Sequence, residues 1–158
     1  MKITNIENFI VDAGWRPWGF VKVETDEGIT GWGECSDGRS PNGVAGTIED
    51  LKPVLIGTDP REFEMRFWDM FRATRQSPGG IAAKALAGLD CAFIDIKAKS
   101  LGISVPELFG GPTRERVRVY WSHCGTSRVG NNELIGVPAL RTWDDITNLG
   151  KEVVERGF

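Results

Sequence analysis

The sequence is poor in the residues from which metal and redox sites are most often built. Its 158 residues contain one histidine, His123, and three cysteines, Cys35, Cys91 and Cys124. There is no Cys-x-x-Cys pair and no second histidine, so a zinc site is excluded. The cysteines are widely spaced and odd in number, which favours free thiols in a reducing cytoplasm over a disulfide framework.

Excess positive charge and long apolar runs are also lacking. Lysine and arginine total 19 against 22 acidic residues, giving a net charge of -3. A nucleic-acid binder would need a basic face. No apolar run is long enough to span a bilayer, and the first residues lack the apolar core of a signal peptide. We therefore expect a cytoplasmic protein that binds neither nucleic acid nor membrane.

The N-terminal part of the sequence has the pattern of β-strands. Residues 2–11, 20–25 and 29–35 are predicted strands, because apolar and β-branched residues recur there with partial alternation. A loop is expected at 12–19. Gly28 is placed to take a positive φ in the turn between the second and third strands. The three strands are therefore predicted to form one antiparallel sheet.

Helical spacing of apolar residues follows the strands. It runs from Val44 to Leu55, resumes after Asp59, and is longest over residues 81–100. Asp59 is the expected N-cap of the second helix, with Pro60 at its first position. Many small residues in the longest helix predict close packing against a neighbour.

The pattern changes near residue 116. Residues 117–122 alternate as in a strand, and a final helix is expected from Thr142 to a stop at Gly157. One strand and one helix cannot complete a core, so they need further strands, as in a β/α barrel. The chain therefore divides into an α+β domain, residues 1–115, and a βα unit, residues 116–158.

Neither part contains a complete active site. Gly28, Gly31 and Gly33 give G-x-x-G-x-G, but within a hairpin rather than between a strand and a helix, which is the wrong context for a dinucleotide site. Ser122, His123 and Cys124 are consecutive, so on a strand they point to opposite faces and make a poor catalytic triad.

Several segments, in order, resemble a known family. They are residues 1–4, the hairpin VKVETDEGITGWGE at 21–34, IGTDP at 56–60, and ALAGLDCAFIDIKAK at 85–99 running into VPELFGG at 105–111. Together they resemble the N-terminal half of enolase-superfamily enzymes of the mandelate racemase/muconate lactonizing enzyme type. The resemblance covers nearly the whole chain.

The resemblance implies a fold and a chemistry. Residues 1–115 would be the α+β capping domain, a three-stranded antiparallel sheet followed by helices. Residues 116–158 would be the first strand and helix of a TIM-like β/α barrel. Family enzymes abstract a proton alpha to a carboxylate, and Mg²⁺ stabilises the enediolate. A sugar-acid dehydratase is the closest likeness; a racemase or cycloisomerase is the alternative.

The same resemblance places the chemistry outside this chain. The family's base, a Lys-x-Lys, would lie just beyond Phe158, and its magnesium ligands later still, so no catalytic or metal-binding residue is expected here. What the chain would contribute is two loops that close over a small carboxylate or sugar-acid substrate, residues 13–19 and 35–43.

The candidate substrate-binding residues lie in these loops and at the end of the expected barrel strand: Trp15, Arg16, Trp18, Asp37, Arg39 and His123. Arg16 suits a substrate carboxylate, since a guanidinium matches its geometry. Trp15 and Trp18 would exclude water, while Asp37, Arg39 and Ser40 would contact hydroxyls. His123 would lie at the mouth of the barrel. For each, a solvated or packing role is the alternative.

Two rival hypotheses remain. The chain could be an inert truncated fragment, which predicts neither magnesium binding nor turnover. It could instead be an independent α+β binding module with the tryptophan loops as its surface, but this leaves the βα unit unexplained. The apolar face of the last helix has no sheet to cover, so we expect association through residues 117–156, as a homo-oligomer or with the missing barrel portion.

Overall fold

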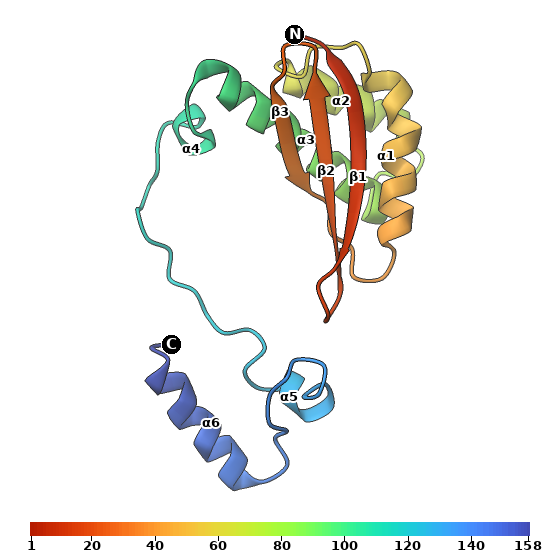
Figure 1. Ribbon diagram of the computed structural model, residues 1–158. Helices are drawn as coiled ribbons and strands as arrows, with labels where there is room; N and C mark the ends of the chain where they lie inside the picture. Colours follow the sequence, from red (N-terminus) through yellow and green to blue (C-terminus); the bar gives the residue numbers. More distant parts are fainter. The chain divides into compact units, whose positions relative to one another are not determined.

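The computed structural model describes all residues, 1–158, and divides into two compact units, Met1–Pro112 and Thr113–Phe158. The division falls close to the expected one between residues 115 and 116. The first unit contains all the strands and most of the helices (Figure 1).

The sheet of the first unit has three antiparallel strands in the order β1-β2-β3. Their bounds are Ile3–Asp12, Pro17–Thr25 and Thr30–Glu34. Gly28 has a φ of 77° in the β2–β3 turn, and its N–H donates to the carbonyl of Thr25 at 3.1 Å. Only glycine takes this conformation without strain, which confirms the predicted hairpin.

The loop expected at 12–19 is shorter than predicted. β1 and β2 remain paired to their ends, with Val11 opposite Trp18 and Asp12 opposite Pro17. Proline is tolerated there because the first residue of a strand need not donate to the ladder. The connecting loop is therefore residues 13–16 only.

Three helices complete the first unit with a short fourth: α1 (Pro41–Leu55), α2 (Phe63–Ala73), α3 (Gly80–Leu101) and α4 (Val105–Leu108). Figure 1 shows α1, α2 and α3 behind one face of the sheet. The core forms between these layers. Its largest fully buried side chains are Phe93, Ile3, Ile6, Ile48, Leu51, Leu55, Met70, Leu89, Ile96, Val21, Val23 and Val44.

Two glycines of β3 explain how closely α3 approaches the sheet. A Cβ at Gly31 would lie 2.1 Å from the carbonyl oxygen of Ala92, and one at Gly33 would lie 1.9 Å from that of Gly88. No side chain fits at such distances, so backbone rests on backbone. In the G-x-x-G-x-G pattern, Gly31 and Gly33 therefore serve packing between β3 and α3, and Gly28 serves the turn.

The start of α2 differs from the prediction. Asp59 is not its N-cap, because its carboxylate accepts hydrogen bonds from the backbone N–H of Arg61 at 2.9 Å and from the Arg61 guanidinium at 2.6 Å. These bonds close a turn before the helix. α2 begins at Phe63, after Glu62.

The second unit contains α5 (Ser127–Gly130) and α6 (Trp143–Glu155). The expected strand at 117–122 does not form. A strand is defined by its ladder, and no other segment of this chain pairs with these residues. Thr142 caps α6, as predicted: the N–H of Asp145 donates to its hydroxyl at 3.2 Å, and its own N–H donates to the Asp145 carboxylate at 2.8 Å. None of the helices combines the length and apolar character that crossing a membrane requires.

Candidate functional site

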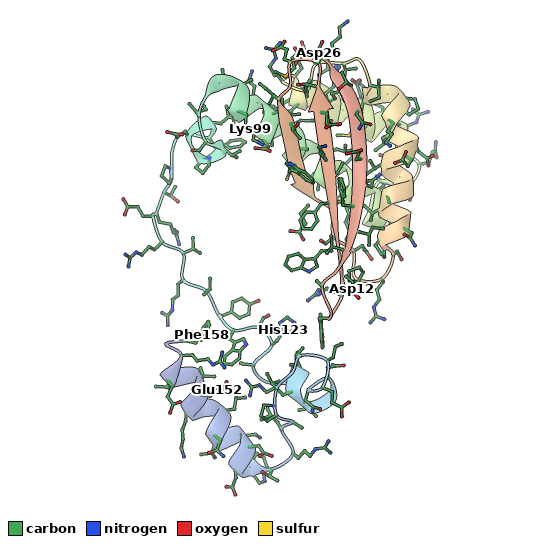
Figure 2. The ribbon with its side chains drawn as sticks, viewed as in Figure 1. Asp12, Asp26, Lys99, His123, Glu152 and Phe158 are labelled. Atoms are coloured by element: carbon green, nitrogen blue, oxygen red, sulfur yellow. The ribbon has the colours of Figure 1, made fainter.

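The two candidate loops of the first unit are neighbours. Loop 13–16 precedes the start of β2. The second loop follows the end of β3, where Phe20 pairs with Glu34, and it ends at residue 40 rather than 43, because α1 begins at Pro41. The N–H of Cys35 donates to the carbonyl of Gly19 at 2.8 Å, and the N–H of Gly19 donates to the Ser36 hydroxyl at 3.1 Å. Asp12 marks this end of the sheet in Figure 2. The hairpin thus brings the loops together.

Asp37 organises the second loop. One of its carboxylate oxygens accepts hydrogen bonds from the backbone N–H groups of Arg39 and Ser40, at 2.8 and 2.7 Å. The other accepts from Lys84 of α3. The Lys84 ammonium, together with the two backbone donors, lowers the pKa of Asp37 to about 2. The carboxylate predicted to meet substrate hydroxyls is therefore bonded within the protein on both oxygens.

The two arginines of the loops are differently placed. Arg16 and Arg39 are exposed, and neither guanidinium forms an ion pair or hydrogen bond within the chain. The stem of Arg16 lies over Gly38, where an added Cβ would be 3.5 Å from the Arg16 Cδ. Two cations without partners on adjacent loops suit an anionic ligand.

The two tryptophans are separated by the strand start. Trp15 is half-buried in the loop, whereas Trp18 lies on β2 and is 48% exposed. The Trp18 ring stands edge-on to Phe20 at 6.3 Å between centroids. On the same uncovered face of the sheet, Phe9 and Trp32 lie 5.5 Å apart. Trp18 therefore belongs to an exposed aromatic face beside the loops rather than to the loop itself.

His123 belongs to the second unit (Figure 2). It is half-buried, and its Nδ1 lies 3.0 Å from the Ser122 hydroxyl. Two residues before His123, the Trp121 ring makes cation–π contacts. The guanidinium carbons of Arg128 and Arg156 lie 5.1 and 4.5 Å from the centre of its ring.

Arg128 is a residue that sequence reasoning missed. It is only 3% exposed and donates to Glu152 of α6 at 2.9 Å. Glu152 also pairs with Arg156, and these contacts lower the pKa of Glu152, the Arg128 hydrogen bond contributing most. The segment that carries His123 is thereby tied to α6 through charge and aromatic contacts. Long sequence separation hides such a cluster from any local pattern.

The chain does not group its acidic residues into a magnesium site. Across residues 1–158, no three histidine, cysteine, aspartate or glutamate side chains lie close enough together to hold a metal ion. Mg²⁺ is usually bound by carboxylates with several waters. The residues of this chain therefore do not fit a magnesium ion.

Comparison with known proteins places this geometry in a family. Residues 13–110 match the N-terminal domain of the mandelate racemase / muconate lactonizing enzyme family. The match covers most of the first unit, including both loops and α3. The chain belongs to this family, as the sequence segments suggested.

Relatives and solved structures agree. D-galactonate dehydratase of Variovorax paradoxus (strain S110) is 41% identical over 121 residues, which are 76% of this chain and 31% of the relative. The chain thus spans about a third of the length of the curated relatives that it matches.

Several solved structures match nearly the whole chain, and two of them illustrate the likeness. One is a candidate L-alanine-DL-glutamate epimerase from Burkholderia xenovorans strain LB400, bound to magnesium and fumarate. It has a TM-score of 0.89 and 37% identity, over 99% of this chain and 39% of that one. The other is an enolase-superfamily member from Salmonella Typhimurium, with a TM-score of 0.85 and 29% identity, over 99% of this chain and 40% of that one. The capping-domain fold is thereby confirmed.

Proposed function

We propose that residues 1–158 form the substrate-closing part of a magnesium-dependent enzyme that removes a proton alpha to a carboxylate and dehydrates a sugar acid. The observation that carries the proposal is the pair of adjacent loops with two unpaired guanidinium groups, in a domain 41% identical to a D-galactonate dehydratase. Cations on a closing lid suit an acid substrate.

Each residue has a proposed role. Arg16 pairs with the substrate carboxylate, and Arg39 and Ser40 contact hydroxyls. Trp15 and Trp18 keep water from the closed site. His123 keeps its predicted role as a substrate contact. The base and the magnesium ligands are proposed to lie in the part of the relatives' length that this chain does not match.

Racemisation or epimerisation is the second candidate. It is supported by the Burkholderia xenovorans structure, whose bound fumarate is itself a carboxylate. Dehydration and epimerisation share the first proton abstraction, so the loops suit both reactions. Dehydration is preferred because curated relatives about 40% identical to this chain are named D-galactonate dehydratase.

A fusion enzyme tests the proposal. Residues 1–158 replace the matching N-terminal segment of the Variovorax paradoxus D-galactonate dehydratase, and turnover is measured with magnesium. D-galactonate and the dipeptide L-Ala-L-Glu serve as rival substrates. We expect dehydration of the sugar acid and no dipeptide epimerisation. A folded fusion that binds magnesium but dehydrates no sugar acid, while the unmodified dehydratase does, would refute the proposed function.

A further inference from the structure

An ion pair between Lys84 and Asp37 joins the second loop to α3. Lys84 and Asp37 are 47 residues apart in sequence, and the Asp37 side chain is 13% exposed within their contact. Because the other carboxylate oxygen of Asp37 already binds two backbone N–H groups of the loop, this side chain both shapes the loop and anchors it.

The anchor is rigid on its α3 side. Lys84 lies near the start of α3, next to Ala85, which is fully buried. Further along, α3 rests on β3 so closely that Gly31 and Gly33 leave no room for a side chain. The helix is therefore fixed to the sheet, and a loop held by Lys84 takes its position from the core.

Arg16 rests on the loop that this pair holds. Its stem lies over Gly38, the residue immediately after Asp37: a Cβ added at Gly38 would lie 3.5 Å from the Arg16 Cδ. Arg16 has no ion pair of its own to fix it, so the surface under its stem is what limits where its guanidinium can go.

We propose that Lys84 is a positioning residue, which holds the 35–40 loop through Asp37 and thereby places the Arg16 guanidinium for the substrate carboxylate. This inference rests on the proposed function for its last step only. The Lys84–Asp37 ion pair, which is the brace, lies within the first unit and can be measured without substrate.

Hydrogen exchange of the complete 158-residue chain measures the brace. In Lys84→Met, the amide exchange rates of Arg39 and Ser40 should rise about three- to fivefold, as expected for the loss of a partly exposed ion pair that limits local opening. Lys84→Arg should restore slow exchange. The matched control is Lys99→Met: Lys99 lies on the same helix, is paired with Asp95 at 2.7 Å, and is 47% exposed against 45% for Lys84.

Kinetics in the fusion enzyme measure the positioning. Lys84→Met should raise the KM for the sugar acid about three- to fivefold with kcat changed less than about twofold, and Lys84→Arg should reverse this. Unchanged exchange at Arg39 and Ser40 would overturn the brace. Faster exchange with an unchanged KM in an active fusion would overturn the positioning role. If the fusion carrying the unmodified chain is inactive, the proposed function fails, and the exchange result alone decides the brace.

Discussion

The charged residues of the loops are of two kinds. Some are bonded within the protein, and others have no side-chain partner and are available to a ligand. Asp37 is bonded on both oxygens, whereas Arg16 and Arg39 have no side-chain partner. A carboxylate whose pKa is lowered in the folded protein stabilises the fold only while it is ionised. Acid should therefore release the 35–40 loop.

The pH at which this happens follows from the pKa of Asp37, which is lowered to about 2 by Lys84 and the loop amides. A lowered folded-state pKa stabilises the loop above the ordinary value of 3.8, and the effect is lost as the pH falls towards 2. A carbon-detected NMR titration should show the Asp37 carboxyl changing near pH 2. The loop amides of Arg39 and Ser40 should shift with it.

The variant Asp37→Asn should abolish that acid response. Asp59→Asn is the control, since Asp59 has a pKa of about 2 for a different reason, its pairing with Arg61 away from the loop. A carboxyl of Asp37 that titrates near 4 would show that the Lys84 contact is not formed in solution.

Single residues of the site were only partly predictable. The six candidates follow from a resemblance that marks the loops, but the role of Asp37 depends on Lys84, which lies 47 residues away on α3. No local spacing relates the two residues. Tertiary contacts decide which loop residue is bonded to the rest of the domain and which is free to contact a ligand.

At the scale of helices and strands, the contact between β3 and α3 is the feature on which the first unit depends. Gly33 meets the carbonyl of Gly88 and Gly31 meets that of Ala92, so backbone atoms of both elements are in contact. A side chain at either position has to push the helix off the sheet.

Gly33→Ala should therefore lower the free energy of unfolding by about 3 kcal/mol, the upper range for overpacking, because the obstacle is backbone that cannot turn aside. Gly46→Ala is the matched control. Gly46 is exposed within α1 with nothing within 4 Å of its Cβ position, so it should gain about 0.5–1 kcal/mol in helix stability. Urea unfolding measures both. Equal stabilities of Gly33→Ala and the unmodified chain would contradict the packing described here.

Regular elements with partners inside the first unit could be predicted from sequence, and others could not. Alternation and the Gly28 turn indicate the sheet, and apolar spacing indicates α3. The pattern at 117–122 equally indicates a strand, but a strand also requires a neighbour, which this chain does not supply. The start of α2 was misplaced because Asp59 binds Arg61 instead of capping the helix.

At the scale of the whole molecule, the two units differ in how much apolar surface they bury. The first has a continuous core, while α6 of the second has no fully buried residue and exposes 84% of Trp143, 50% of Ile146 and 74% of Val154. Exposed apolar side chains gathered on one helix are typical of a surface that associates with a partner.

We therefore predict that the isolated chain associates through α6 or binds an apolar dye. Ile146→Lys with Val154→Lys should reduce both effects, since charge disfavours burial of that face. Light scattering and dye fluorescence measure them. A monodisperse monomer without dye binding would contradict the prediction.

The proposed contact between Arg16 and the substrate carboxylate is tested by Arg16→Met in the fusion with the D-galactonate dehydratase barrel. Losing a charged partner of the substrate carboxylate should lower kcat/KM for D-galactonate about 30-fold or more. Arg72→Met, which removes an exposed arginine of α2 paired with Asp69, should leave it unchanged. An Arg16→Met fusion as active as the unmodified fusion would contradict the account.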